Sequence, residues 1–129
     1  MERDQLWSGG PYLLQSAEVF KLGTDSVLLA DFALGIRAES AADLGCGCGV
    51  IAIALAYQKD IKVDAIDISE AAAELTRRNA SLNGLDEKIK VICGDIRNHR
   101  ELLKAGAYDL VVSNPPYFAG GSGKTAKTE

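Results

Sequence analysis

The feature that most constrains how this chain can fold is the segment Asp-Leu-Gly-Cys-Gly-Cys-Gly at residues 43–49. It follows an apolar run that begins at residue 41, and it precedes Val-Ile-Ala-Ile-Ala-Leu-Ala-Tyr-Gln, a helix-like run at residues 50–58. Glycines between a strand and a helix permit a tight turn and let a ligand come close to the backbone. The segment therefore predicts a ligand-binding turn at the end of a parallel strand, or a turn that serves only to redirect the chain.

Strand and helix patterns alternate after this turn. Strands are predicted at residues 62–68, 90–93 and 108–113. Ser69 is expected to cap a helix that ends at Asn83-Gly84, and a short helix is expected around Leu102. Because crossovers between parallel strands are right-handed, this order gives one sheet. The predicted fold class is α/β: a Rossmann-like parallel sheet with helices on both faces, which stops after its fourth strand.

The chain is predicted to form one incomplete domain over residues 1–129. An N-terminal segment and helix occupy residues 1–40, the Rossmann-like core residues 41–118, and a flexible tail rich in Gly, Thr and Lys residues 119–129. Within the first part we predict a turn at residues 8–11, a short strand at 12–15, and a helix at 26–34 with Thr24 or Asp25 as its N-cap.

Composition sets the class of protein. Hydrophobic residues make up 47% and charged residues 25%, as in ordinary globular proteins. No apolar run approaches the roughly 20 residues of a membrane span, and the N-terminus lacks the pattern of a signal peptide, so we expect a cytoplasmic protein without a membrane partner. The three cysteines are expected to be free thiols, and we expect no metal site because Cys46 and Cys48 lack zinc-ligand spacing.

Three aspartates follow the ends of successive predicted strands. Asp67 can accept hydrogen bonds from both hydroxyls of a ribose, or it can cap the next helix. Asp95 can accept from an adenine amino group, or it too can cap a helix, and Asp43 would face a positively charged part of a ligand. No Lys or Arg is expected beside them, which argues against a pyrophosphate. The set favours a nucleoside with cationic groups, such as S-adenosylmethionine, over NAD, whose turn has different glycine spacing.

The segment Ser-Asn-Pro-Pro-Tyr-Phe at residues 113–118 follows the last predicted strand. A planar, conjugated NH2 group is a poor nucleophile because its lone pair is delocalised. The side-chain oxygen of Asn114 and the carbonyl of Pro115 can accept its two N–H bonds and favour a more tetrahedral nitrogen, which lowers the barrier to methyl transfer. Tyr117 offers a flat face on which the target group can stack. The alternative is that these prolines only end a strand.

These motifs carry a resemblance to a known family. The segments DLGCGCG, AIDIS, CGDIR and SNPPYF resemble class I S-adenosylmethionine-dependent methyltransferases that act on amino nitrogens, and cover most of residues 41–118. With FKLGTDSVLLADFA upstream and GSGK downstream, the chain looks most like the N-terminal part of bacterial tRNA1(Val) adenine-N6 methyltransferases. The resemblance implies S-adenosyl-L-methionine as cofactor and adenine N6 in tRNA as the target.

The resemblance also implies residue roles. The target amino group would be held by Asn114, Pro115, Pro116 and Tyr117. The cofactor would be held by Thr24, Asp25, Asp43, Gly45, Cys46, Gly47, Asp67, Ile68, Asp95, Ile96 and Asn114. Thr24 and Asp25 would belong to a segment that closes over it.

A complete sheet of this family has more strands than this chain supplies, so the resemblance places much of the tRNA contact in a missing C-terminal part. The apolar strand at residues 110–112 would then have an open edge, and we expect a homodimer, or another oligomer, that covers it. Two other functions stay open: a protein glutamine-N5 methyltransferase, because a glutamine amide poses the same planar-nitrogen problem, and a non-catalytic module that binds the cofactor but no substrate.

Overall fold

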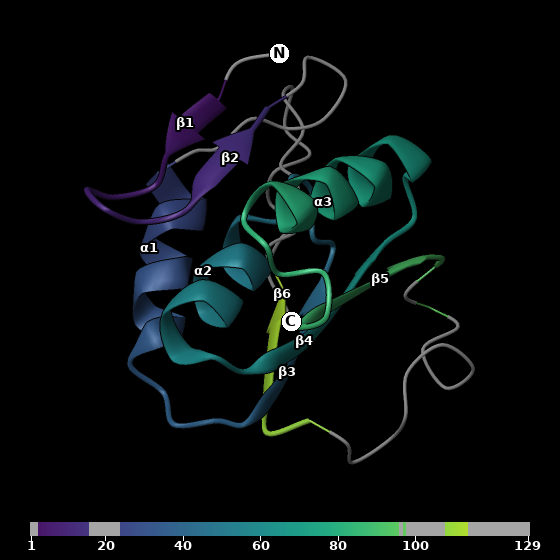
Figure 1. The fold of residues 1–129 in the computed structure, drawn as a ribbon. Coiled ribbons are helices and arrows are strands. Elements are labelled where there is room, and N and C mark those ends of the chain that lie inside the picture. The colour runs from purple at the N-terminus through teal and green to yellow at the C-terminus, as the bar shows by residue number, and fades with distance from the viewer. Residues whose placement is uncertain (1–2, 16–23, 96, 98–107, 114–129) are drawn as a thin grey trace.

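The computed structural model describes residues 3–15, 24–95, 97 and 108–113, with backbone only for residues 24–28. Its centre is a four-stranded parallel sheet in the order β5-β4-β3-β6 (Figure 1). The strands are β3 (Ser40–Leu44), β4 (Lys62–Asp67), β5 (Ile89–Cys93) and β6 (Leu110–Ser113). The predicted α/β class and parallel sheet are confirmed.

The strand order creates a switch point between β3 and β6. The chain starts the sheet at β3, adds β4 and β5 on one side, and places β6 on the other side. The carboxyl ends stay aligned, since Asp67 pairs with Cys93 and Leu44 pairs with Ser113. Ligands of open α/β sheets bind outside the carboxyl ends at such a point, so the topology directs attention to this edge.

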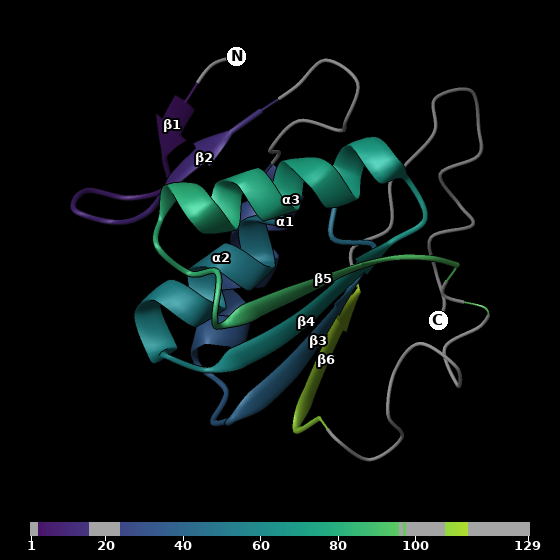
Figure 2. The ribbon, with the colours of Figure 1, turned by 45° about the vertical axis from the view of Figure 1, so that its right-hand side comes forward.

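The described helices cover one face of the sheet. They are α1 (Thr24–Leu34), α2 (Val50–Lys59) and α3 (Glu70–Leu82), and Figure 2 shows all three on the same side. For α2 and α3 this follows from chain order, because they connect β3, β4 and β5 and right-handed crossovers in one direction place such helices on one face. Helix α1 precedes β3 and packs against α2. The helix expected around Leu102, on which cover of the other face depends, lies outside the described residues.

Helix α2 is apolar around its whole circumference, and all of its residues from Val50 to Ala56 are buried. Helix α1 packs on one side of it and the sheet on the other, which is the setting that such a helix requires. No described helix has both the length and the apolar character needed to cross a bilayer.

Local signals set both ends of α3. Ser69 is the N-cap, as predicted, and its hydroxyl accepts from the Ala72 N–H at 3.1 Å. After Leu82 the chain turns through Gly84, whose φ is +70°, and the Leu85 N–H donates to the Ala80 carbonyl at 2.8 Å. The N-cap expected for α1 is wrong, because Thr24 and Asp25 both lie inside that helix.

An antiparallel hairpin precedes the sheet and forms a separate two-stranded unit, β1 (Arg3–Gln5) with β2 (Tyr12–Leu14). The sequence predicted β2 but not β1. Leu13 is fully buried in the core, and the ring of Trp7 meets Tyr57 of α2 edge to face, with ring centres 6.3 Å apart. The hairpin is therefore anchored to the same core as the helices.

Candidate functional site

The glycine turn between β3 and α2 lies at the carboxyl edge of the sheet. Gly47 and Gly49 have φ values of +58° and +92°, a region that other residues enter only with strain. A Cβ at Gly47 would meet no atom within 4 Å, whereas one at Gly49 would lie 2.9 Å from Cγ2 of Thr76. Gly49 is therefore needed for packing, and Gly47 borders open space in which a ligand can approach the backbone.

Neighbouring elements fix the turn on several sides. The N–H groups of Gly45 and Cys46 both donate to the Ile66 carbonyl of β4, at 2.8 and 3.0 Å. From α3, the Thr76 hydroxyl donates to the Gly47 carbonyl at 2.9 Å. Asn79 of the same helix donates to the Cys48 carbonyl at 2.7 Å. The turn thus has a defined shape that depends on β4 and α3.

Asp67, at the end of β4, belongs to this arrangement. One carboxylate oxygen accepts from the Gly47 N–H and the other from the Ser69 N–H, both at 2.9 Å. Ser69 and not Asp67 is the helix N-cap, so the capping alternative for Asp67 is wrong. Each carboxylate oxygen can accept a second hydrogen bond, which leaves capacity for ligand hydroxyls.

Asp43 is buried, with 1% of its surface exposed. Its carboxyl group accepts from the Ala52 N–H in the first turn of α2, but its Oδ1 atom has no hydrogen-bond partner in the part of the chain that the structure describes. The pKa of Asp43 is raised to about 7, mainly by burial and also by the charge of Asp67, while the hydrogen bond from Ala52 opposes the rise. An unpaired buried oxygen is costly, and the site therefore lacks one donor.

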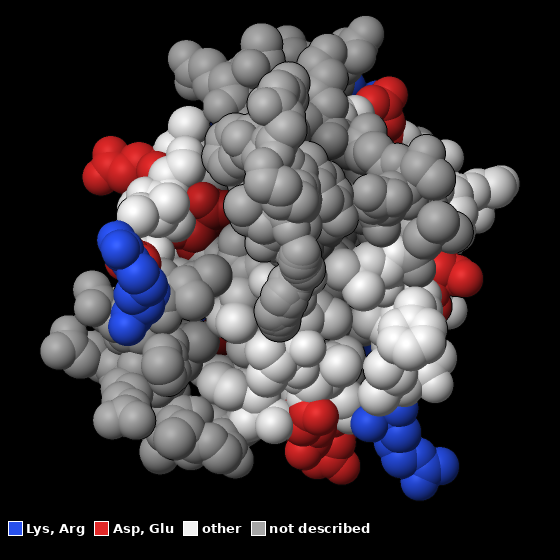
Figure 3. Space-filling model, turned by 180° about the vertical axis from the view of Figure 1, so that it is seen from behind, with Lys and Arg blue, Asp and Glu red and all other residues white. Residues whose placement is uncertain are grey.

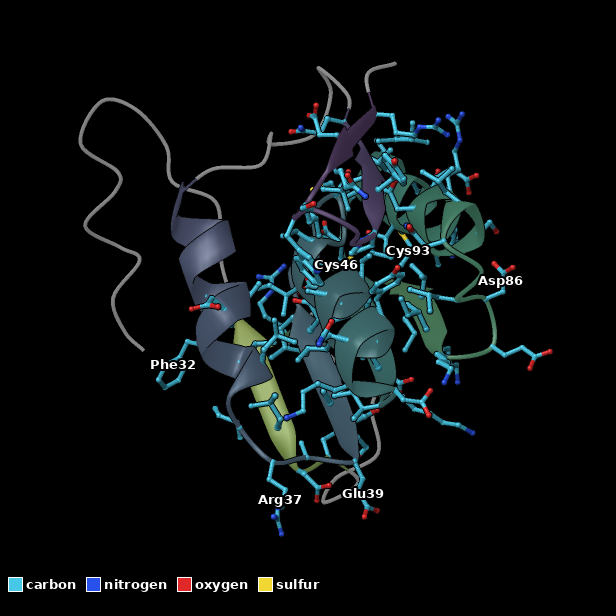
Figure 4. The ribbon with its side chains drawn as sticks, turned by 60° about the vertical axis from the view of Figure 1, so that its left-hand side comes forward. Phe32, Arg37, Glu39, Cys46, Asp86 and Cys93 are labelled. Carbon is cyan, nitrogen blue, oxygen red and sulfur yellow. The ribbon has the colours of Figure 1, made fainter. Side chains whose placement is uncertain are left out.

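The two thiols of the turn are buried, and they are expected to react slowly because burial favours the protonated form. Burial raises the pKa of Cys46 far above its usual range and that of Cys48 to about 11. The Sγ atom of Cys46 lies 3.3 Å from the Thr76 hydroxyl. Cys93 is exposed and lies with Cys46 toward the carboxyl end of the strands, away from Arg37 and Glu39 (Figure 4). All three cysteines are free thiols, as predicted.

Asp95 differs from the expectation. Its carboxylate accepts from the backbone N–H of Arg97 at 2.9 Å and from the guanidinium of the same residue. The prediction that no cation lies beside the aspartates is therefore wrong, since the chain after β5 returns Arg97 to Asp95. Hydrogen bonds from Arg97 lower the pKa of Asp95. Ile68 lies nearby in sequence after β4 and is 65% exposed.

The structure thus brings together most of the predicted cofactor residues that it describes. Asp43, Gly45, Cys46, Gly47 and Asp67 meet at the turn, and Asp95 follows the neighbouring strand β5. Outside the described residues lie Ile96, Asn114, Pro115, Pro116 and Tyr117, and the side chains of Thr24 and Asp25. These assignments stay predictions.

Two residues of the site were not predicted. Thr76 and Asn79 are fully buried on the inner face of α3, where an apolar pair would be ordinary. Two polar residues on the apolar face of an amphipathic helix are a signal in the sequence, because buried polar groups need partners.

Comparison with known proteins assigns the family. The sequence profile described as "Methyltransferase small domain" matches residues 16–129. The chain belongs to this methyltransferase family. Within it, the chain is 39% identical over 103 residues to a protein of Aeromonas hydrophila named tRNA1(Val) (adenine(37)-N6)-methyltransferase, and 41% identical over 100 residues to the protein of that name from Serratia proteamaculans.

These matches cover 78% and 76% of the chain but only 42% and 38% of the two relatives. The chain thus spans about two fifths of the length of the curated relatives that it matches.

Solved structures agree with the family assignment. A methyltransferase from Methanococcus maripaludis, described as putative and S-adenosyl-L-methionine-dependent, has a TM-score of 0.59 and 31% identity, with 67% of this chain and 40% of that chain covered. The tRNA (uracil-54, C5)-methyltransferase of Pyrococcus abyssi in complex with S-adenosyl-L-homocysteine has a TM-score of 0.73 at 24% identity, with 89% and 28% covered. The second likeness concerns the fold alone. The predicted class I methyltransferase fold is confirmed.

Proposed function

We propose that this chain is the cofactor-binding part of an S-adenosylmethionine-dependent methyltransferase that modifies N6 of adenine in tRNA. The family assignment and the named relatives at 39% and 41% identity support the reaction class and the substrate. The fold supports a nucleoside ligand, because the turn, Asp67 and Asp95 follow three neighbouring strands at one edge of the sheet. A cytoplasmic location is part of the proposal, because a tRNA substrate is consistent with it.

The single observation that carries the proposal is the Oδ1 of Asp43, which has no partner among the described residues and lies beside a turn where these residues leave open space at Gly45 and Gly47. A carboxylate that lacks a donor fits a ligand that carries an ammonium and a sulfonium, because a cation favours the ionised form of a buried acid. A pyrophosphate would place further negative charge beside Asp43 and Asp67. The described residues therefore fit S-adenosylmethionine better than NAD.

Asp67 and Asp95 would hold the nucleoside part. Asp67 already holds the Gly47 N–H and retains acceptor capacity for ribose hydroxyls. Asp95 accepts from an adenine amino group once the exposed guanidinium of Arg97 swings away, since exposed ion pairs exchange readily with solvent. Ile68 and Ile96 would contact the adenine ring, and Thr24 and Asp25 the open side of the ligand.

The acceptor side of the reaction is assigned to Asn114, Pro115, Pro116 and Tyr117, which follow β6 in the sequence. S-adenosylmethionine, when bound, supplies a methyl group activated by a sulfonium. The Asn114 side-chain oxygen and the Pro115 carbonyl would accept the two N–H bonds of the target amino group, and Tyr117 would stack on its ring. The proton can leave after the transfer, so no general base is required beforehand.

Cofactor binding is tested by calorimetry with S-adenosylmethionine. Asp67→Ala removes a charged acceptor for the ribose and should weaken binding at least tenfold, about 1.4 kcal/mol. Asp86→Ala is the matched control, because Asp86 is an exposed acid in the loop before β5, at the other end of that strand, and should leave affinity unchanged. Equal affinities of the Asp67 variant and the wild type would remove Asp67 from the site.

The substrate is tested by transfer of a radiolabelled methyl group, with unmodified tRNA and a release factor as competing acceptors. We expect label in tRNA, and Asn114→Ala should abolish turnover while cofactor affinity is retained. Label in the release factor would identify a glutamine-N5 methyltransferase instead. Cofactor binding without transfer to either acceptor would identify a non-catalytic module. A fully active Asn114 variant would disprove the acceptor mechanism.

Two partners are proposed. The described Lys and Arg side chains that Figure 3 shows lie apart on that face. We propose that most of the tRNA contact is made by the part of the relatives that this chain does not span. Strand β6 pairs with β3 along one edge, and no described strand pairs with its other edge. Self-association through that edge is therefore proposed. A single monomer mass by light scattering at high concentration would refute it.

A further inference from the structure

Asn79 of α3 joins two segments that are far apart in the sequence. It is fully buried. Its Oδ1 accepts from the Leu14 N–H at 2.6 Å, and its Nδ2 donates to the Leu14 carbonyl at 3.1 Å and to the Cys48 carbonyl at 2.7 Å. Both donors of the amide are thus used, one toward the hairpin and one toward the glycine turn.

Asn83, one helical turn later, bonds to the backbone of Tyr12 on β2 in the way that Asn79 bonds to that of Leu14. Its Oδ1 accepts from the Tyr12 N–H at 2.8 Å, and its Nδ2 donates to the Tyr12 carbonyl at 2.7 Å. Its remaining bond goes to the Asn79 carbonyl at 2.8 Å within α3. Strand β2 pairs with β1 on one edge, as Figure 2 shows. Its other edge is bonded to the side-chain amides of Asn79 and Asn83, and of these two only Asn79 also bonds to the glycine turn.

The turn responds to α3 through two consecutive carbonyls. Thr76 holds the Gly47 carbonyl at 2.9 Å and Asn79 holds that of Cys48. The Gly47 N–H, which donates to Asp67, belongs to the preceding peptide group, and it is joined to the Gly47 carbonyl through the Cα of Gly47. The bonds from α3 therefore act on this N–H through the backbone angles of Gly47. Loss of the Asn79 bond would leave a buried carbonyl without its partner, and the peptide would rotate to find another.

We propose that Asn79 is a positioning residue that couples docking of the hairpin to the shape of the cofactor turn. This inference rests on the proposed function, since it assumes that the turn binds S-adenosylmethionine. Coupling free energies are reciprocal, so a ligand on the turn must stabilise the hairpin by as much as the docked hairpin favours the ligand. A residue that serves stability alone has no such effect.

The first measurement uses the unaltered chain with S-adenosylhomocysteine as the probe. Hydrogen exchange of the Leu14 amide should slow several-fold when the probe binds, and Trp7, the only Trp of the chain, should report the tighter hairpin by its fluorescence. Asn83→Ala is the control, because it removes the two hydrogen bonds to Tyr12 and no bond to the glycine turn. It should keep the affinity for the probe and the ligand effect at Leu14.

The second measurement uses Asn79→Asp, which keeps the size of the side chain and an acceptor for the Leu14 N–H but donates to neither carbonyl when ionised. We expect about tenfold weaker binding of the probe and loss of the ligand effect at Leu14. A folded Asn79 variant with unchanged affinity, or Leu14 exchange in the wild type that ignores a bound probe, overturns the inference alone. No binding to the wild type refutes the proposed function, and the inference with it. Should the variant fail to fold, the wild-type and Asn83→Ala measurements still decide.

Discussion

Gly49→Ala tests whether the glycine turn is fixed by contact with α3. The backbone of Gly49 has φ +92°, and a residue with a Cβ loses roughly 1–2 kcal/mol there from strain alone. The added methyl would lie 2.9 Å from Cγ2 and 3.1 Å from Oγ1 of Thr76, which is itself fully buried and bonded to Gly47. Overpacking of this kind costs about 1–3 kcal/mol more.

The expected loss in the free energy of unfolding is therefore about 2–5 kcal/mol, measured by urea denaturation. Gly84→Ala is the matched control, because Gly84 has φ +70° but open space around its Cβ, so strain alone should act and the loss should stay near 1–2 kcal/mol.

A double-mutant cycle isolates the contact. Thr76→Ser removes the Cγ2 methyl and keeps the hydroxyl that donates to Gly47. In that background the cost of Gly49→Ala should fall by about 1 kcal/mol, because the shortest contact is gone. Equal losses for Gly49→Ala and Gly84→Ala, together with no coupling to Thr76→Ser, would refute the argument that α3 shapes the turn.

Three other predictions concern single side chains. The pKa of Asp43 is raised to about 7 in the fold, so this carboxyl group holds a proton between about pH 4 and 7 that it would lose in the unfolded state. Its contribution to stability should therefore fall as pH rises through that window. Asp43→Asn should remove this contribution in urea titrations at pH 5 and 7.5, and an unchanged difference between the two pH values would contradict the prediction. Ellman's reagent should titrate one thiol rapidly, Cys93, while Cys46 and Cys48 react only on unfolding; rapid reaction of all three would show an open turn. Asp60 ends α2 with φ +59°, so Asp60→Gly should raise the unfolding free energy by up to about 1 kcal/mol, and a clear loss in a thermal melt would contradict the strain argument.

The parts of the fold that the sequence predicted are those written in neighbouring residues. The glycine turn, the Ser69 cap and the Asn83-Gly84 end of α3 each depend on residues within a few positions of one another, and the four strands of the sheet follow from apolar runs between such signals. The structure places them within one or two residues of the predicted bounds. Their order then fixed the sheet, because few topologies accommodate alternating strands and helices.

The parts that escaped prediction depend on contacts across the chain. The sequence Arg-Asp-Gln of β1 has no strand pattern and becomes a strand only because β2 pairs with it. Asn79 stands out as a polar residue on the apolar face of α3, but its partners in β2 and the turn are far from it in the sequence. Sequence spacing carries no record of these two encounters. The pairing of Arg97 with Asp95 is different, because the two residues are only two positions apart and the pair could have been predicted.

Under the proposed function, the hydrogen bond between Asp67 and the Gly47 N–H has a consequence for the speed of cofactor capture. The carboxylate holds the Gly47 N–H in one orientation. A preorganised turn loses little backbone entropy when a ligand binds, so the first phase of association should be fast and should need no reordering of residues 45–49. In that respect the turn is a preorganised binding site.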